Sequence, residues 1–264
     1  MRIGVYPFAS TNSIKDNLFV IKKAIRLAAE NQVRLLVFHE CALTGYPLME
    51  TKIEEIRRDE VENALSEIAA LAKECGLFVA VGTVRFEEDK RFNSVVVFDE
   101  NGNRMGCYDK KALWGWDTDN FAAGDRLGLF RVDDVNVGFR ICFDVRFPEP
   151  FRELYKENAD ICFVSFSDTS EKPLPNRYEI IKSHLRTRAV ENVMTVVSVN
   201  SIAGCQTAPT AVFDCNGNLA KEAEPNVEAL LVYDYAKPAV SFGMKGRIVN
   251  SNAFLKISDS SREE

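Results

Sequence analysis

Histidine is nearly absent from this 264-residue sequence, which contains only His39 and His184. These two residues lie far apart in the chain, and the seven cysteines show no Cys-x-x-Cys spacing that would complete a set of metal ligands. No metal site and no cofactor are therefore expected, and His39 is expected to pack or to support a neighbour. Because seven is an odd number and most of the cysteines lie in apolar runs, a disulfide framework is not expected either.

Excess positive charge and long apolar runs are also lacking. The sequence has 33 Lys and Arg against 39 Asp and Glu, a net charge of −6, so it offers no cationic surface for nucleic acid or anionic lipid. No apolar stretch approaches the roughly 18 residues that span a bilayer, and the opening MRIGVYPFAS is too weakly apolar for a signal peptide. We predict a cytoplasmic protein whose partners include neither nucleic acid nor membrane.

Linkers and repeats are missing as well. No Gly/Ser/Pro-rich segment divides the chain, and its 46% hydrophobic content is enough for one large core. The sequence therefore predicts a single domain over residues 1–264.

Strand and helix patterns alternate along this predicted domain. Helices are expected at 13–32, where Ser13 is the N-cap, and at 60–75, 148–159 and 176–192. Strands are expected at 2–8, 33–40, 77–86, 92–99, 104–110, 127–132, 136–142, 160–168 and 193–201. We expect the strands between 77 and 142 to continue one sheet, and 210–218 and 228–235 to form a hairpin-like pair. Strands that are apolar on both faces need cover on both sides, which predicts an α/β fold of sheets flanked by helices.

Three apolar runs end in a chemically reactive side chain. LLVFHE delivers Glu40, CYDKKALW delivers Lys110, and VGFRIC delivers Cys142. Side chains at the carboxyl ends of strands in α/β sheets converge on one crevice, so these three can share a pocket. There a thiol acts as the nucleophile, a carboxylate takes its proton and an ammonium group stabilises an oxyanion. Residue type alone leaves an alternative to a shared pocket, in which Cys142 packs in the core while Glu40 and Lys110 are solvated.

The sequence around each of these residues is more specific. LLVFHECALTGYP, YDKKAL, GFRICFDVRFPEPFRELYKENAD, and RTRAVEN followed by VVSVN occur in this order, and they resemble the motifs of the nitrilase superfamily of carbon–nitrogen hydrolases. The resemblance implies a four-layer α-β-β-α sandwich. It also implies that Cys142 is the nucleophile and that Glu40 is the general base and later acid. Lys110 and the backbone N–H of Phe143 would then stabilise the tetrahedral intermediate.

Some residues near this predicted site depart from the family pattern. Many members carry a second glutamate a few residues beyond the lysine, whereas this chain has Asp117 in WGWDTDNFAAGD. Asp117 is a candidate fourth catalytic residue that would orient the lysine or the substrate, and the alternative is a surface loop residue held by local turn bonds. Lys111 does not fit the motif and is expected to be solvated. Ile181 stands where many relatives have Trp, so the pocket wall is expected to differ.

The residues after the nucleophile favour the amidase branch, because Phe-Asp replaces the Trp-Glu of true nitrile hydrolases. The predicted reaction is hydrolysis of a small linear amide by water, through a cysteine acyl-enzyme, to ammonia and a carboxylic acid. No glycine-rich phosphate loop is present, which argues against an ATP-driven amidation. Arg146, Asp168 and Thr169 are candidate substrate contacts, and pairing of Arg146 with Glu149 or with a helix end is the favoured alternative for that arginine.

Two other functions stay open at this point. One is hydrolysis of N-carbamoyl amino acids or other ureido compounds, and the other is a non-catalytic binding module that retains the fold. An intact Glu-Lys-Cys set argues against the binding module, which has no need of all three groups. The resemblance further implies a homodimer or higher homo-oligomer, with the helix at 148–159 and the RTRAVEN helix near the contact. The helix that begins at Pro148 is also expected to direct its N-terminus toward Cys142.

Overall fold

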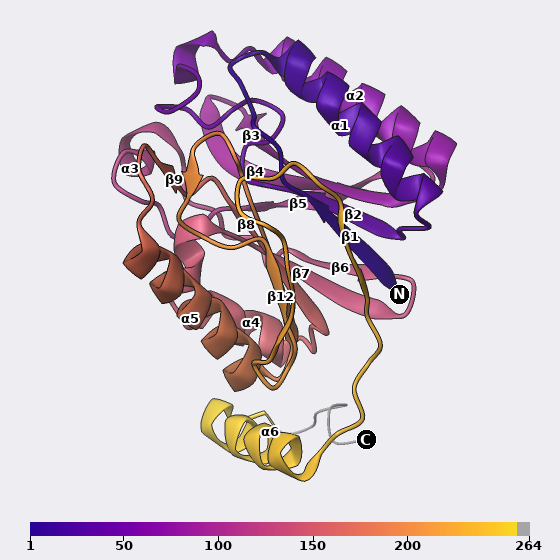
Figure 1. Cartoon of the computed structure of the whole chain (residues 1–264), viewed down its shortest axis with the longest axis vertical. Helices are drawn as coiled ribbons and strands as arrows, with labels where there is room; N and C mark the ends of the chain where they lie inside the picture. Colours follow the sequence, from indigo (N-terminus) through magenta and orange to yellow (C-terminus); the bar gives the residue numbers. More distant parts are fainter. Residues whose placement is uncertain (258–264) are drawn as a thin grey trace.

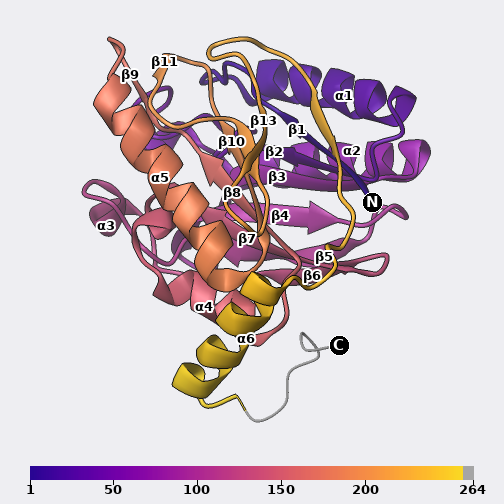
Figure 2. The same cartoon turned by 60° about the horizontal axis from the view of Figure 1, so that its bottom comes forward.

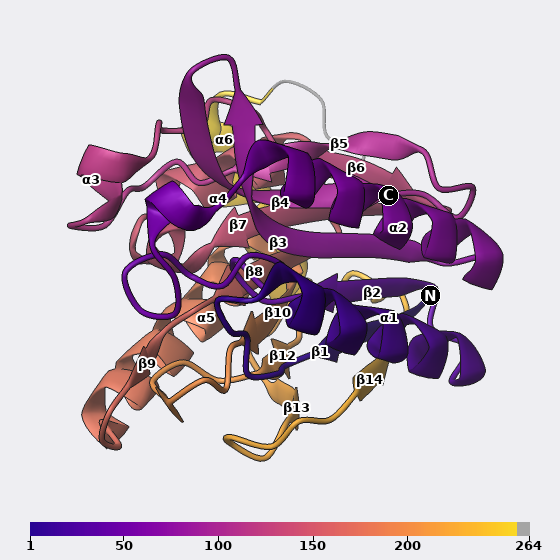
Figure 3. The same cartoon turned by 90° about the horizontal axis from the view of Figure 1, so that it is seen from above.

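Two six-stranded sheets lie face to face, with helices on both outer sides (Figure 1). A computed structural model describes residues 1–257, and the last part of the predicted domain, 258–264, lies outside this range. Seen from above, α1 (Ile14–Glu30) and α2 (Arg58–Cys75) lie side by side over the first sheet (Figure 3). The order of layers is therefore α-β-β-α, which confirms the predicted fold.

The first sheet combines parallel and antiparallel strands. Its order is β14 (Leu231–Asp234), β1 (Arg2–Tyr6), β2 (Leu35–Phe38), β3 (Phe78–Glu87), β4 (Lys90–Phe98) and β5 (Arg104–Asp109). The strands β1, β2 and β3 are parallel and are joined through α1 and α2. Ser13 caps α1 by accepting a hydrogen bond from the Asp16 amide, and Gly76 ends α2 in a left-handed conformation with φ of 67°.

The second sheet has the same number of strands and its own pair of helices. Its order is β13 (Leu219–Glu222), β12 (Ala211–Phe213), β10 (Thr195–Asn200), β8 (Ile161–Phe166), β7 (Val135–Ile141) and β6 (Leu129–Val132). The strands β7, β8 and β10 are parallel. Figure 2 shows α4 (Glu149–Lys156) and α5 (Pro175–Asn192) on the outer side of this sheet.

Apolar side chains fill the space between the sheets and the spaces beneath both helix layers. Between the sheets, Phe139 of β7 stacks on Phe163 of β8 with ring centroids 5.7 Å apart. Separate apolar clusters join the first sheet to α1 and α2, and the second sheet to α4 and α5. Full burial of one such side chain contributes about 1.5–3 kcal/mol. The central strands are covered on both faces, which is why their sequences are apolar throughout.

Two sequence predictions about strand pairing are wrong. The strands β6 and β7 belong to the second sheet and do not continue the sheet that contains β3, β4 and β5. The segments 210–218 and 228–235 do not pair, because β12 pairs with β13 while β14 pairs with β1 of the other sheet. The strand β13, with the sequence LAKE, is largely exposed and too polar to be recognised from its pattern.

Short elements surround one end of the sandwich. They are η1 (Ile53–Glu55), α3 (Asp117–Asn120), η2 (Cys142–Arg146) and the paired β9 (Thr169–Ser170) and β11 (Cys205–Gln206). The helix α6 (Phe242–Leu255), which sequence analysis missed, lies beyond the end of α5 that is far from β9 (Figure 2). Its Met244 and Ile248 pack against Val193 and Cys215. Within residues 1–257, no helix is long and apolar enough to cross a membrane.

Candidate active site

The predicted reactive residues follow strand ends and line one pocket of about 260 Å³. Glu40 comes just after β2, Lys110 directly after β5, and Cys142 directly after β7. The first two belong to the first sheet and the third to the second sheet, so the pocket lies where the sheets meet. Its apolar lining comes from Met49, Trp114, Val145, Phe166, Leu174 and Ile181.

Glu40 is the centre of a buried hydrogen-bond network. Its Oε1 accepts hydrogen bonds from Lys110 Nζ at 2.9 Å and from Asn93 Nδ2 at 2.7 Å. Its Oε2 accepts a hydrogen bond from the backbone N–H of Ser167 at 2.7 Å. Burial raises the pKa of Glu40, and the charge of Lys110 opposes this rise. A carboxyl group with a raised pKa can both accept a proton and return it, as a general base and acid must.

Gly82 of β3 allows the turn that carries Glu40 to approach the strand. A Cβ atom on Gly82 would lie 2.1 Å from the carbonyl oxygen of His39 and 2.7 Å from the amide nitrogen of Cys41. Backbone atoms cannot move aside as the end of a flexible side chain can. Any side chain at this position would therefore displace the turn and the carboxylate with it.

Asp117 occupies the other side of Lys110. Its Oδ2 accepts a hydrogen bond from Lys110 Nζ at 2.7 Å, and its Oδ1 accepts one from the hydroxyl of Tyr46 at 2.6 Å. Asp117 is fully buried, so the alternative of a surface loop residue is wrong. The lysine thus stands between two carboxylates, and these two negative charges raise the pKa of Lys110 well above its usual value against the opposing effect of burial.

Cys142 is held in an uncommon backbone conformation. It is the first residue of η2, and its φ of 43° lies in the left-handed region that residues with a side chain seldom adopt. The sharp turn directs the partly exposed thiol into the pocket. Burial and the nearby Glu40 raise the pKa of this thiol, while Lys110 lowers it. The thiol therefore keeps its proton until a base removes it, and Glu40, whose pKa is raised, lines the same pocket.

Asp144 ties the turn of Cys142 to the segment that carries Lys110. Its Oδ2 accepts hydrogen bonds from the Ile141 amide at 2.8 Å and from the hydroxyl of Tyr108 at 2.7 Å. Its Oδ1 accepts a hydrogen bond from the Ala112 amide at 2.8 Å. One buried carboxylate thus joins the two sheets beside the nucleophile. This contact was not predicted, although an acidic residue inside the apolar run RICFDV indicates a buried carboxylate.

The candidate substrate contacts differ in their surroundings. Asp168 receives two hydrogen bonds from Arg177, each 3.0 Å long, and a third from the hydroxyl of Thr207, so its carboxylate is occupied. Thr169 lies in β9 at the rim of the pocket. Arg146 also lines the pocket, and its Nη1 lies 3.2 Å from Nε2 of His184.

Several expectations for neighbouring residues need correction. Within residues 1–257, Arg146 makes no ion pair with Glu149, so that part of the favoured alternative is wrong, and its side chain contacts His184 instead. Lys111 is only partly solvated, because its side chain is 19% exposed and its Nζ lies 2.6 Å from a carboxylate oxygen of Glu153. Cys142 is itself the first residue of η2, and α4 begins at Glu149, after the end of η2. The approach of the α4 N-terminus to Cys142 stays a prediction.

His39 has the packing role that the sequence suggested. The side chain is fully buried, and its ring centroid lies 4.7 Å from that of Phe8. Its Nδ1 lies 3.0 Å from the carbonyl oxygen of Glu40. Burial lowers the pKa of His39 to about 4, so the ring is neutral at neutral pH.

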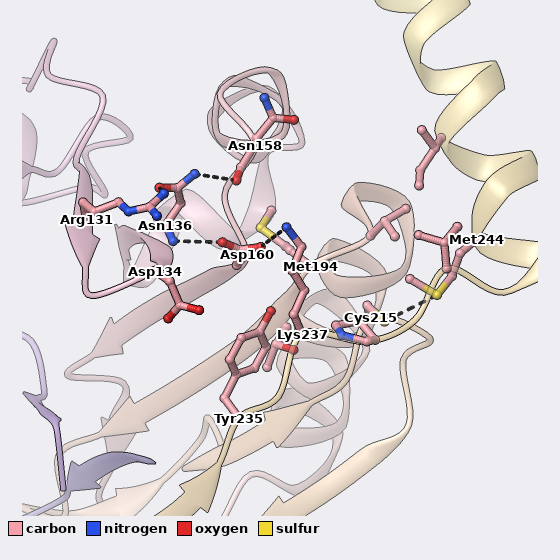
Figure 4. A pocket seen from close by; sticks show the side chains of 15 residues that line it. Arg131, Asp134, Asn136, Asn158, Asp160, Met194, Cys215, Tyr235, Lys237 and Met244 are labelled. Carbon is pink, nitrogen blue, oxygen red and sulfur yellow. Dashed lines mark hydrogen bonds and ion pairs between the residues drawn. The ribbon is translucent and has the colours of Figure 1, made fainter. Parts of the chain in front are cut away.

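A second pocket, of about 190 Å³, lies between the second sheet and α6 (Figure 4). It contains another cysteine, Cys215, whose Sγ contacts the thioether sulfur of Met244 at 4.0 Å. Asp160 in this pocket accepts a hydrogen bond from the Asn136 amide at 2.9 Å and lies 3.7 Å from Lys237 Nζ. Cys215 packs against a thioether there, whereas Cys142 shares its pocket with Glu40 and Lys110.

Known proteins share both the sequence pattern and the fold. The sequence model of the carbon–nitrogen hydrolase family matches residues 2–241. A 2-oxoglutaramate amidase of Bacillus subtilis (strain 168) is 30% identical over 193 residues, which cover 72% of this chain and 70% of that protein. A deaminated glutathione amidase of Dictyostelium discoideum is 27% identical over 223 residues, with 75% of this chain and 72% of that protein covered.

Solved structures of an amidase from Nesterenkonia sp. have the same fold. One superposes with a TM-score of 0.79 at 23% identity and covers 90% of each chain. A mutant of the enzyme from Nesterenkonia sp. AN1, with a TM-score of 0.79, 22% identity and 90% of each chain covered, carries the acetamide moiety of fluoroacetamide added covalently at its active-site cysteine. The family match over most of the sequence, together with the 30% identical relative, shows that the chain belongs to the carbon–nitrogen hydrolase family.

Proposed function

We propose that this protein, acting as a single carbon–nitrogen hydrolase domain, is an amidase for small amides that carry a carboxylate group at the end opposite the amide. The observation that carries the proposal is one pocket lined by Glu40, Lys110, Cys142 and Arg146. The first three residues hydrolyse the amide C–N bond, and the fourth selects the substrate. The products are ammonia and a carboxylic acid.

The first half of the reaction forms an acyl-enzyme. Glu40 takes the thiol proton of Cys142 as the sulfur attacks the amide carbonyl carbon. The resulting oxyanion is stabilised by Lys110 Nζ and by the backbone N–H of Phe143, and both residues line the pocket. Glu40 then returns the proton to the amide nitrogen, the C–N bond breaks, and ammonia leaves a thioester on Cys142.

The second half of the reaction consumes water. Glu40 accepts a proton from a water molecule as its oxygen attacks the thioester carbon, and the same two donors stabilise the second oxyanion. The C–S bond then breaks, the proton returns to the sulfur, and the carboxylic acid leaves. Both halves need a group that alternates between base and acid, which suits the raised pKa of Glu40.

Asp117 supports this cycle through Lys110. Its carboxylate lies 2.7 Å from Lys110 Nζ, which fixes the direction of the ammonium group and keeps it charged. Its negative charge also raises the pKa of Glu40, which makes that carboxylate a better proton acceptor. The shorter aspartate thus performs the work that a second glutamate performs in other members.

Arg146 gives the pocket its preference for an anion. Arg177, in the same pocket, is neutralised by Asp168 at 3.0 Å, and Lys110 is shared by two carboxylates. Within residues 1–257, Arg146 forms no ion pair with an acidic side chain, and its Nη1 lies beside the uncharged ring nitrogen of His184. A substrate carboxylate would supply the missing anion. The Bacillus subtilis relative is named for 2-oxoglutaramate, an amide that also carries a carboxylate.

Ammonia release from a matched panel of compounds tests this proposal. Succinamate and glutaramate carry a terminal carboxylate, 4-methylpentanamide replaces the carboxylate of succinamate by an uncharged group of similar shape, and N-carbamoylglycine tests the ureido reaction. We expect kcat/KM for succinamate to exceed that for 4-methylpentanamide by about tenfold or more, the scale of one charged hydrogen bond. Arg146→Met should remove this preference, and Arg186→Met, a change of an exposed arginine of α5 outside the pocket, should not.

Three results would contradict the proposal. Faster turnover of N-carbamoylglycine than of every amide would favour the ureido reaction. No ammonia from any compound, with Cys142 unmodified by a thiol reagent, would favour a binding module. Equal kcat/KM for succinamate and 4-methylpentanamide would refute the role of Arg146.

The proposal extends to a homodimer or higher homo-oligomer that associates through the face of α4 and α5. Leu174 and Ile180 are 46% and 49% exposed, and Phe147, before α4, is 40% exposed. Exposed large apolar side chains are common at protein interfaces. Light scattering at micromolar concentration should give at least twice the mass of one chain, and a monomer mass would contradict this part of the proposal.

We also propose a cytoplasmic location. All seven cysteines are free thiols, the proposed nucleophile among them, which suits a compartment that keeps thiols reduced. Cell fractionation should find the protein and its amidase activity in the cytoplasmic fraction, and recovery outside it would contradict the assignment.

A further inference from the structure

Arg146 and His184 form a contact at the wall of the active-site pocket. Arg146 is the last residue of η2, four positions after the nucleophile, and its side chain reaches the pocket. His184 lies on α5, in a shallow surface depression that also includes Glu179. The two side chains meet with Arg146 Nη1 at 3.2 Å from His184 Nε2.

The chemistry of the two groups fixes the direction of this hydrogen bond. A guanidinium group is charged at every relevant pH and can only donate. Nε2 of His184 must therefore accept, which places the ring proton on Nδ1 and leaves the ring neutral. Burial, Arg146 and Arg188 all lower the pKa of His184, so its surroundings favour this neutral form.

The charged groups around His184 come from η2 and from α5 itself. Arg146 is the cation from η2, and Arg188 is a second cation one turn farther along α5. Arg188 is already engaged, because its Nε donates to the Val145 carbonyl oxygen at 3.1 Å and its Nη1 to Glu191 at 2.6 Å. Glu179 is the acid that shares the surface depression with His184.

We propose that His184 is a positioning residue that holds the Arg146 guanidinium toward the substrate carboxylate and releases it when the imidazole becomes protonated. This inference rests on the proposed function. A neutral imidazole fixes the arginine without neutralising it, which an aspartate or glutamate in its place could not do. An imidazolium cannot accept the hydrogen bond and repels the guanidinium, so selection for the anionic substrate weakens at low pH.

The ratio of KM for succinamate to KM for 4-methylpentanamide tests this inference, because effects on the shared chemistry cancel in the ratio. In His184→Leu we expect the ratio to rise about tenfold, since the arginine loses its acceptor. In His184→Gln the side-chain oxygen restores an acceptor, and the ratio should stay close to that of the wild-type enzyme. Ser183→Ala, a change of an exposed neighbour on the same helix, is the matched control and should leave the ratio unchanged.

The pH dependence of the same ratio gives a second readout that a packing role would not produce. In the wild-type enzyme the ratio should be constant above about pH 6.5, the usual pKa of histidine, and should rise at lower pH. In His184→Gln it should stay flat from pH 5 to 8. If His184→Leu does not fold, the comparison of wild type with His184→Gln decides the question.

Failure of this inference can be told apart from failure of the proposed function. A wild-type ratio near one at pH 8 would refute the role of Arg146 and the role of His184 with it. A wild-type preference for succinamate, combined with an unchanged ratio in His184→Leu or with the same pH profile in His184→Gln, would refute the role of His184 alone.

Discussion

Replacing Asp117 by asparagine removes one negative charge from the site while nearly keeping the shape of the side chain. In the wild-type protein one oxygen of Asp117 lies 2.7 Å from Lys110 Nζ, and the other lies 2.6 Å from the Tyr46 hydroxyl. An asparagine has a single acceptor oxygen, so one of these two donors would meet an NH₂ group. With the NH₂ group toward Lys110, the lysine is held by Glu40 alone, and in either orientation the second negative charge beside Lys110 is lost.

The size of the effect follows from these contacts. A hydrogen bond to a charged group contributes about 1.5–3 kcal/mol, and each 1.36 kcal/mol of barrier is a tenfold change in rate. Loss of the Asp117 charge also lowers the pKa of Glu40 and weakens it as a base. We expect kcat for succinamate to fall by about ten- to a hundredfold in Asp117→Asn.

Steady-state ammonia release measures this fall, and a matched control stands on the same short helix. Asp119 is exposed and lies two positions away, so Asp119→Asn should keep kcat within a factor of about two. Asp117→Glu retains the charge but inserts a methylene into a filled space, which typically costs about 1–3 kcal/mol of stability. An unchanged kcat in Asp117→Asn would mean that Glu40, Lys110 and Cys142 work without this fourth residue.

Three further predictions concern other parts of the site. Cys142→Ala should abolish ammonia release and keep the wild-type circular dichroism spectrum. Cys162→Ala is the control and should retain activity. Turnover by Cys142→Ala would exclude the acyl-enzyme. Gly82→Ala should reduce both activity and melting temperature, because its Cβ would lie 2.1 Å from a backbone oxygen, and wild-type values of both would contradict the role of that glycine. His39 has a pKa of about 4 when folded and about 6.5 when unfolded, so the unfolded state binds the proton more tightly. The free energy of unfolding should therefore fall by up to about 3 kcal/mol as the pH falls from 6.5 to 4. Urea unfolding should therefore show a weaker loss over this range in His39→Phe than in the wild type, and equal losses would refute the assignment.

Local sequence was enough to predict the residues at the strand ends. Glu40 and Cys142 follow the apolar strands β2 and β7, and Lys110 follows the more polar strand β5. The motifs around all three residues extend over a few residues only. The predicted cap at Ser13 is also local, because a helix terminus is satisfied by its own neighbours.

Contacts between distant segments could not be predicted in this way. Ser167 donates to Glu40 across 127 positions, and this contact exists only because β2 and β8 stack in different sheets. The pairing of Arg146 with His184 likewise depends on how η2 packs against α5. The helix α6 escaped prediction for another reason, since its sequence FGMKGRIVNSNAFL contains two glycines and two asparagines, which are poor helix formers.

The division of the site between the two sheets makes amidase activity a measure of how closely they dock. Glu40 and Lys110 belong to one sheet and Cys142 to the other, and Asp144 bridges them through Tyr108 and Ala112. A partly denatured state that keeps both sheets but loosens the layer between them would retain its far-ultraviolet circular dichroism and release no ammonia. A cut between β5 and β6 would leave Glu40 and Lys110 on one fragment, and Cys142 on the other together with β14, the last strand of the first sheet. The two fragments would be inactive separately, and recovery of ammonia release on mixing them would report reassembly of the sandwich.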